Sequence, residues 1–230
     1  MPNFKTGTVI YHANPASTYY DVIVKADQPL QYIPGQFVSI KVADRKVNPY
    51  SIASIPEPNH FRLIIDNKPG GAGSQFFTYL KIGDTIQFLG PLGRFTLKPT
   101  EAAEYIFLAT GSGIAPLRTM IEHLLQQEKT TKPVKLYFGL RHPQDIFWQN
   151  TLKQLVDQHP NFTYKITLSR PDDQWQGQTG YITDHLKADF SDTSNAVIYI
   201  CGGKEMIEQA SKLAQSLGTP KAQIHYERFW

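Results

Sequence analysis

The chain has 230 residues, which exceeds the usual size of one domain, and its 41% hydrophobic content excludes a disordered protein. Its 23 basic and 20 acidic residues are interspersed and give a net charge of +3, without the basic stripe of a nucleic-acid-binding protein. The start of the chain lacks a signal-peptide pattern and no stretch approaches the roughly 20 apolar residues of a membrane span, so we expect a cytoplasmic protein without membrane or nucleic-acid partners.

The N-terminal part of the chain consists of short apolar runs separated by Gly, Pro, Asn and Asp. Closely spaced short strands with such turn signals predict an antiparallel barrel or sandwich. One helix is expected there, over residues 74–80. The expected strands cover residues 6–12, 19–25, 37–42, 49–53, 61–66 and 85–89.

The rest of the chain alternates strand-like runs with segments of helical period. This alternation predicts a parallel sheet covered by helices on both faces. We therefore expect two domains, residues 1–98 and 99–230, joined within residues 91–104. The expected strands cover residues 105–109, 134–139, 164–168 and 197–201, and the expected helices begin at Pro116 and cover residues 146–156 and 206–217.

A glycine turn follows the first expected parallel strand and leads directly into a helix. Thr110, Gly111 and Gly113 precede Pro116, which suits a first helical position. Bare backbone at a helix N-terminus suits a pyrophosphate, although a tight strand-to-helix turn would have the same pattern. The common dehydrogenase fingerprint needs a third glycine and an acidic residue after the second strand, but this chain has Pro116 and Arg141 there.

The run from Gly111 to Pro116 resembles the nicotinamide-nucleotide turn of the ferredoxin–NADP reductase family. Pro49-Tyr50-Ser51 and the glycine run before Ser74 resemble that family's two flavin motifs, in the family's order. The resemblance implies an N-terminal antiparallel Greek-key β-barrel for the flavin, followed by a Rossmann-like parallel α/β domain for NAD(P). Cys201 is the single cysteine, so an iron–sulfur cluster cannot be held by this chain alone, and we expect a stand-alone two-domain reductase.

The resemblance also implies the flavin site. Tyr50 would stack on the flavin ring and Ser51 would lie near the atom that accepts hydride. The family's arginine is Asn48 here, which leaves FMN or loosely held flavin as alternatives to FAD unless Arg45 or Lys46 compensates. Two alternatives involve no flavin: Tyr50 would be an aromatic residue of the core, and the glycine run before Ser74 would be a flexible hairpin loop. The expected flavin-binding residues are Asn48, Pro49, Tyr50, Ser51, Gly71, Ala72, Gly73 and Ser74, with Trp230, or Phe229, as an aromatic cover on the flavin.

The nicotinamide site is implied in the same way. Arg170 would recognise the 2′-phosphate of NADPH, unless it is a solvated arginine and NADH is the donor. Ser51, Cys201 and Glu227 are the expected catalytic residues, acting by positioning, although a lone buried cysteine is usually core packing. The expected NAD(P)-binding residues are Thr110, Gly111, Gly113, Pro116, Arg141, Ser169, Arg170, Tyr181, Cys201, Gly202 and Met206.

The implied function is hydride transfer from NAD(P)H to FAD, followed by electron delivery to a ferredoxin, a flavodoxin or an oxygenase component. One alternative is an NAD(P)H:flavin reductase that uses free flavin as substrate. A non-catalytic nucleotide-sensing subunit is the other. The seven histidines show no metal-ligand spacing, so no metal site is expected.

Overall fold

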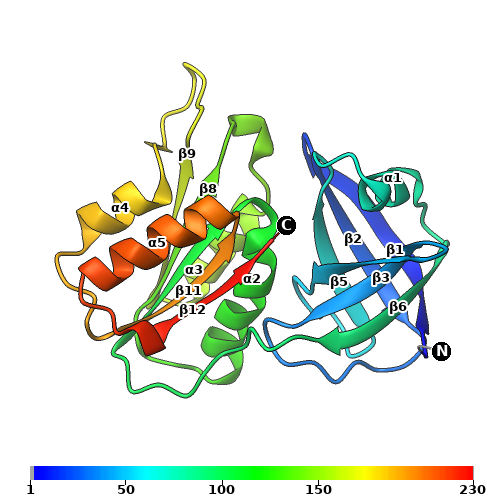
Figure 1. The fold of residues 1–230 in the computed structure, drawn as a ribbon, viewed down its shortest axis with the longest axis horizontal. Coiled ribbons are helices and arrows are strands. Elements are labelled where there is room, and N and C mark those ends of the chain that lie inside the picture. The colour runs from blue at the N-terminus through cyan, green and yellow to red at the C-terminus, as the bar shows by residue number, and fades with distance from the viewer. Residues whose placement is uncertain (1–2, 230) are drawn as a thin grey trace.

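The computed structural model describes residues 3–229, which form two units, each built on a six-stranded sheet (Figure 1). The N-terminal sheet is antiparallel, with the strand order β4-β3-β6-β1-β2-β5. The connections from β2 to β3 and from β5 to β6 join strands that are not neighbours, as in a Greek key. The strands are β1 (Lys5–Ala16), β2 (Tyr19–Ala26), β3 (Phe37–Ala43), β4 (Lys46–Ser51), β5 (His60–Asp66) and β6 (Thr85–Leu92).

The two edge strands of this sheet meet and close it into a barrel. Ser54, just after β4, forms an antiparallel bridge with Arg62 of β5, and the Arg62 N–H donates to the Ser54 carbonyl. Closure removes the exposed strand edges. The short helix α1 (Ala72–Tyr79) precedes β6 and begins two residues earlier than expected. The predicted antiparallel barrel is therefore confirmed.

The second sheet is entirely parallel, with the strand order β10-β9-β8-β7-β11-β12. The predicted parallel α/β domain is therefore confirmed. Its strands are β7 (Glu104–Thr110), β8 (Val134–Leu140), β9 (Phe162–Leu168), β10 (Gln178–Thr179), β11 (Ala196–Gly202) and β12 (Ile224–Arg228). Its helices are α2 (Ile114–Glu122), continued by one π-helical segment (His123–Gln127), α3 (Gln149–Gln158), α4 (Ile182–Asp189) and α5 (Lys204–Ser216).

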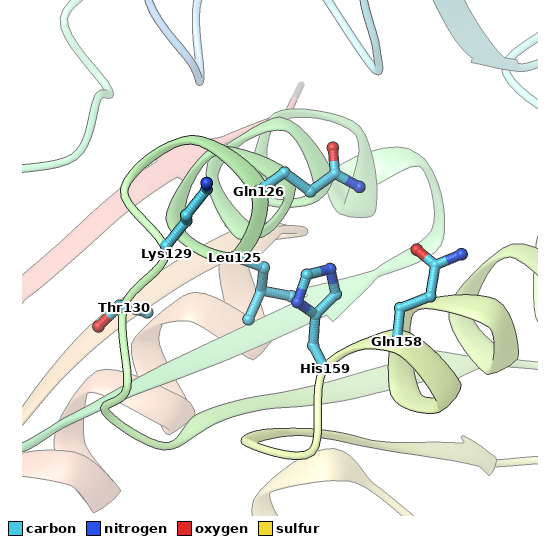
Figure 2. A pocket seen from close by; sticks show the side chains of 6 residues that line it. All are labelled: Leu125, Gln126, Lys129, Thr130, Gln158 and His159. Carbon is cyan, nitrogen blue, oxygen red and sulfur yellow. The ribbon is translucent and has the colours of Figure 1, made fainter.

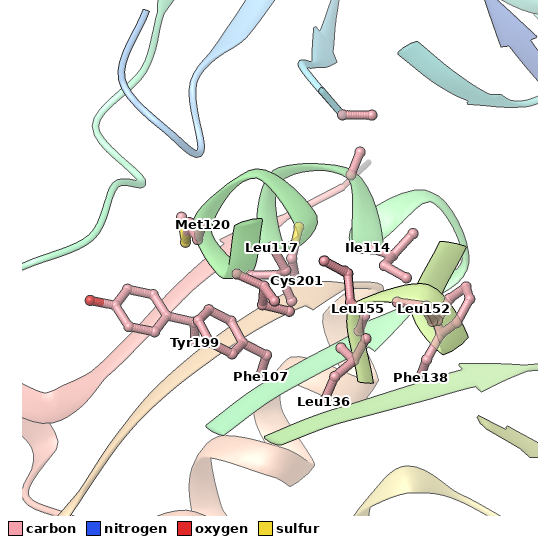
Figure 3. Packing of buried hydrophobic residues seen from close by; sticks show 14 of the residues in the cluster. Phe107, Ile114, Leu117, Met120, Leu136, Phe138, Leu152, Leu155, Tyr199 and Cys201 are labelled. Carbon is pink, nitrogen blue, oxygen red and sulfur yellow. The ribbon is translucent and has the colours of Figure 1, made fainter. Parts of the chain in front are cut away.

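Alternate residues of the parallel strands supply the cores on the two faces of this sheet. Phe107 and Tyr199 stack on the face covered by α2 and α3, with ring centroids 5.4 Å apart (Figure 3). Ile106 and Ile198 lie on the opposite face, which α4 and α5 cover. This period of two explains why continuous apolar runs form strands that are buried on both sides.

Three details of the second unit differ from the sequence expectation. Helix α3 begins at Gln149 rather than at residue 146, because Trp148 has a φ of 58° and interrupts the helical backbone. Helix α4 and the two-residue strand β10 were not expected. Strand β12, which contains Tyr226 and Glu227, was not among the expected strand ranges.

Side chains from both units form a shared interface. The Ser17 hydroxyl donates to Asp145 at 2.8 Å, and the Trp148 indole N–H donates to Asp21 at 3.0 Å. Beside the linker, the Lys98 N–H donates to the Tyr199 hydroxyl at 2.8 Å. Strand β6 ends at Leu92 and β7 begins at Glu104, and the domain boundary after residue 98 stays a prediction.

Within residues 3–229, none of the helices combines the length and the hydrophobicity needed to cross a lipid bilayer.

Candidate functional site

The glycine turn lies between the end of β7 and the start of α2. Gly111 has a φ of 56°, a conformation that favours glycine. Gly113 lies directly on the end of β11, because a Cβ at this position would overlap the Cys201 carbonyl oxygen and lie 2.6 Å from its carbonyl carbon. Pro116 is the third residue of α2 rather than the first, and a 3-10 turn from Gly111 to Gly113 runs directly into this helix, with the Ile114 N–H donating to the Gly111 and Ser112 carbonyls. The N–H groups without helical partners are therefore those at the start of the glycine turn itself. These N–H groups can bind a phosphate.

The end of β11 brings further predicted residues to this turn. A Cβ on Gly202 would overlap the Thr110 hydroxyl and lie 2.5 Å from the Met206 methyl carbon. Only a glycine leaves room there for both side chains. The structure therefore gathers Thr110, Gly111, Gly113, Gly202 and Met206 at the carboxyl ends of two adjacent strands, the edge at which open α/β sheets bind ligands.

Cys201 and Glu227 are neighbours on adjacent strands, because they are register partners in the pairing of β11 with β12. Cys201 is fully buried, and Figure 3 shows it beneath helix α2. Its burial, together with the nearby Glu227 carboxylate, raises the pKa of the thiol well above its ordinary value. Burial also raises the pKa of Glu227 to about 7. Cys201 therefore stays a neutral thiol at physiological pH, while Glu227 can change its charge there.

The residues of the first expected flavin motif lie against the start of α1. The Asn48 amide donates to the Tyr50 hydroxyl at 3.4 Å, and a Cβ on Gly73 would overlap that hydroxyl. The Tyr50 ring packs edge-on against Phe77 with centroids 4.9 Å apart and keeps part of its surface exposed. Pro49 alternates with Asn48 and Tyr50 along β4, so its side chain points to the other face of the strand. Ser51 is buried at the end of β4.

The start of α1 fits the phosphates of a flavin nucleotide. No atom lies within 4 Å of a Cβ placed on Gly70 or Gly71, and no side chain caps the helix. The N–H groups of Ala72, Gly73 and Ser74 are in the first turn and lack helical partners. This open backbone cradle, next to Tyr50, can hold an anionic diphosphate.

The ends of β8 and β9 bring a third group of predicted residues together. The Arg170 N–H donates to the Arg141 carbonyl at 2.8 Å, and the Ser169 hydroxyl donates to the Leu140 carbonyl at 3.5 Å. Tyr181 precedes α4, and Gly180 next to it donates to the Leu168 carbonyl at the end of β9. Two arginines, a serine and an exposed tyrosine at one sheet edge can recognise a phosphate and an adenine ring.

The flavin motif and the glycine turn approach each other across the interface between the units. Ala53, two residues after Ser51, belongs to the same buried cluster as Ala109, Ile114 and Cys201. The chain after Ser51 thus packs on the strand and helix that flank the glycine turn. Trp230, the expected aromatic cover, lies outside the described residues.

Tyr19 is a residue of this interface that the sequence interpretation missed. Its side chain comes from β2 of the barrel, yet its hydroxyl lies against Gly111 of the glycine turn. It belongs to no recognisable motif. Only the alternation of β2 could have indicated that its ring is buried, and nothing in the sequence indicated its neighbour.

The hollow shown in Figure 2 lies elsewhere, where α3 and the π-helical segment after α2 end. Helices of such a domain run antiparallel to its strands, so these ends lie at the amino edge of the sheet, opposite the glycine turn. None of the predicted site residues lines it. The residues that line the hollow are Leu125, Gln126, Lys129, Thr130, Gln158 and His159.

Within residues 3–229, no group of three His, Cys, Asp or Glu side chains could hold a metal ion.

Two families of oxidoreductase domains match the two units. Residues 16–97 match the family described as "Oxidoreductase FAD-binding domain", and residues 107–212 match "Oxidoreductase NAD-binding domain". The fold and the site thus define a two-domain oxidoreductase, with FAD on the barrel and NAD(P) on the parallel-sheet unit.

Similarity to known proteins identifies the family to which the chain belongs. The chain is 34% identical over 188 residues to ferredoxin–NADP reductase B of Sorangium cellulosum, covering 78% of this chain and 77% of that protein. It is 31% identical over 202 residues to the toluate 1,2-dioxygenase electron transfer component of Pseudomonas putida, covering 87% of this chain but 59% of that protein. The crystal structure of the Amycolatopsis cytochrome P450 reductase GcoB is similar, with a TM-score of 0.92 and 26% identity over 99% of this chain and 70% of that one. The chain belongs to the ferredoxin–NADP reductase family, as its sequence predicted.

Proposed function

We propose that this protein transfers a hydride from NAD(P)H to FAD and passes the electrons to a ferredoxin, a flavodoxin or an oxygenase component. One observation carries this proposal: the chain after the flavin motif and the glycine turn meet in one buried cluster, through Ala53 and Ile114. Two nucleotides bound at these motifs would approach each other at the interface. The printed names of the relatives support it, since one is a ferredoxin–NADP reductase and another an electron transfer component.

The barrel holds and orients the flavin in this proposal. Bound FAD supplies the hydride acceptor and can release electrons singly. The first-turn N–H groups of α1 bind the diphosphate, Tyr50 offers its part-exposed ring to the flavin, and Ser51 fixes the edge of the ring by a hydrogen bond. These groups align the reactants rather than exchange protons with them.

The parallel-sheet unit holds the nicotinamide nucleotide. The glycine turn and the start of α2 bind the pyrophosphate, while Arg141, Ser169, Arg170 and Tyr181 bind the adenosine end. Cys201 is fully buried and stays neutral, so it would support the nicotinamide pocket from beneath as an uncharged packing group. Glu227, beside it, would hydrogen-bond the nicotinamide amide. The two arginines favour NADPH over NADH because of the additional phosphate.

The second candidate is an NAD(P)H:flavin reductase whose flavin leaves after reduction. The Asn48 amide supports it, because this amide is hydrogen-bonded to Tyr50 and carries no charge for a diphosphate. Lys46 alternates onto the same face of β4 as Asn48 and Tyr50, and it is exposed. We propose that Lys46 supplies the positive charge that the family's arginine would supply at position 48. Bound FAD is therefore better supported than free flavin as a substrate.

The test is to load the purified protein with FAD, remove unbound flavin, and measure flavin per chain and NAD(P)H-dependent reduction of a ferredoxin. The proposal predicts one FAD per chain and ferredoxin reduction without added flavin. Colourless protein that reduces added free flavin would support the second candidate. Nucleotide binding without any turnover would indicate a sensing subunit and refute both.

A further inference from the structure

Tyr19 is the first residue of β2 in the barrel, but its side chain packs against the other unit. It is 4% exposed, and its ring centroid lies 4.7 Å from that of Phe147, which precedes α3. It also shares a buried cluster with Ala109 and Ile114, on either side of the glycine turn. The ring is therefore held firmly, and with it the position of the hydroxyl group.

The hydroxyl group of Tyr19 lies directly on the glycine turn. A Cβ added to Gly111 would come within 3.0 Å of this oxygen, so the hydroxyl faces the backbone of the residue whose left-handed conformation shapes the turn. Gly111 also begins the 3-10 turn that leads into α2, and the first N–H groups of such a turn lack helical partners.

Within residues 3–229 this hydroxyl has no hydrogen-bond partner, and its oxygen keeps contact with solvent, so it is the accessible tip of a side chain that is otherwise almost fully buried. Burial, and then Asp66 and Asp145, raise the pKa of Tyr19, while the Arg141 guanidinium lowers it. The net effect keeps the hydroxyl protonated, so it stays a hydrogen-bond donor at every physiological pH. A donor at the accessible tip of a firmly packed ring is oriented in advance and is free to donate to a ligand.

We propose that the Tyr19 hydroxyl donates a hydrogen bond to the pyrophosphate of the nicotinamide nucleotide bound at the glycine turn. This inference rests on the proposed function and adds to the nucleotide site a residue from the barrel. Phosphate oxygens are strong acceptors, and the adjacent helix N-terminus favours their charge at this place. Because the donor comes from the barrel, nucleotide binding also holds the two units in register.

The proposal predicts which ligands bind more weakly when the Tyr19 hydroxyl is removed. The pyrophosphate is common to NADH and NADPH, so loss of the hydroxyl weakens both equally, in contrast to loss of Arg170. ADP, which retains a diphosphate, should also bind more weakly, whereas AMP should change little.

The test compares Tyr19→Phe with the wild type, both loaded with FAD, by calorimetric titration with NAD⁺, NADP⁺, ADP and AMP. Phenylalanine keeps the ring packed on Phe147, so flavin content and melting temperature should stay unchanged. We expect the Kd values of NAD⁺ and NADP⁺ to rise about 10-fold, as for one lost hydrogen bond to a charged group. Tyr105→Phe is the matched control, since Tyr105 is buried in the same cluster but is the second residue of β7, at the opposite end of that strand from the turn.

Equal affinities in Tyr19→Phe and the wild type would overturn the inference and leave the proposed function intact. A change for NADP⁺ alone would overturn it too, by showing that the hydroxyl serves the 2′-phosphate. So would a loss of flavin or a lower melting temperature in Tyr19→Phe, which would make the hydroxyl structural. A wild type that binds neither nucleotide would overturn the proposed function, and this inference with it.

Discussion

Replacing Gly113 by alanine tests whether helix α2 begins directly on strand β11. Gly113 has a φ of −60° and a ψ of −15°, which alanine adopts readily, so the cost is steric and not conformational. The added Cβ would overlap the Cys201 carbonyl oxygen and lie 2.6 Å from its carbon and 3.0 Å from the Gly202 nitrogen. All three are backbone atoms, so no change of rotamer can relieve the overlap.

The cost follows from the displacement that this overlap requires. Ordinary contact begins at 3.4 Å, so α2 and β11 must separate by on the order of 1 Å. Overpacking of this kind costs about 1–3 kcal/mol, which lowers the melting temperature of a chain of this size by about 2–12 °C. The shift also moves the N–H groups of the glycine turn, so NADP⁺ should bind more weakly.

The assay is thermal unfolding followed by titration with NADP⁺, with Gly203→Ala as the control. Gly203 precedes α5 as Gly113 precedes α2, but no atom lies within 4 Å of its added Cβ. Gly203→Ala should therefore melt at the wild-type temperature or slightly above it. Gly113→Ala that melts at the same temperature as Gly203→Ala would refute the direct packing of α2 on β11.

Four further substitutions test the other parts of the site. Tyr50→Ala should weaken FAD binding by about 10-fold, through loss of an aromatic contact with the flavin. Asn48→Arg should tighten FAD but not riboflavin in the same titration, since only FAD carries a pyrophosphate. Arg170→Ala should lower kcat/KM for NADPH by about 10- to 100-fold and leave NADH nearly unchanged in steady-state assays. Glu227 has its pKa raised from 4.5 to about 7 by burial, so the folded state favours its protonated form. This contribution to the free energy of unfolding is lost as the pH rises from about 5 to 8. Over that range the free energy of unfolding of the wild type should fall by on the order of 2 kcal/mol more than that of Glu227→Gln, as measured by denaturant unfolding.

Each of these predictions has a result that would contradict it. Unchanged FAD affinity in Tyr50→Ala would make Tyr50 core packing. Equal gains for FAD and riboflavin would place Asn48 away from the diphosphate. Equal losses for both nicotinamide nucleotides would make Arg170 structural. Parallel pH profiles of wild type and Glu227→Gln would show that Glu227 titrates at an ordinary carboxyl pKa.

The sequence predicted those parts of the fold that local pattern determines. Continuous apolar runs such as Tyr105 to Ala109 form the buried parallel strands, and the change from short strands to alternation marks the second unit. Helix α4 was missed because only Ile182 and Leu186 in it are buried, too few to show a helical period. The connection from β10 at the sheet edge to the parallel strand β11 nonetheless has to cross the sheet, and α4 lies on it.

The candidate site could be predicted from the sequence where a short motif alone indicates the kind of ligand, as the glycine turn indicates a pyrophosphate. The structure brings together the three expected groups of residues, but their roles as ligands of FAD and NAD(P) stay predictions. The delayed start of α3 was not predictable, since the left-handed conformation of Trp148 accompanies an indole hydrogen bond to Asp21 in the other unit. The contact of Tyr19 with Gly111 is of the same kind, because it depends on how the two units pack.

The proposed function requires that the two units bring NAD(P)H and FAD together for direct hydride transfer. The most direct test is anaerobic stopped-flow mixing of the FAD-loaded protein with NADPH, and with NADPH deuterated at the transferred position of the nicotinamide. We predict that one equivalent of NADPH bleaches the flavin absorption and that deuteration slows this bleaching. Flavin that stays oxidised in the presence of both NADPH and NADH would contradict the account.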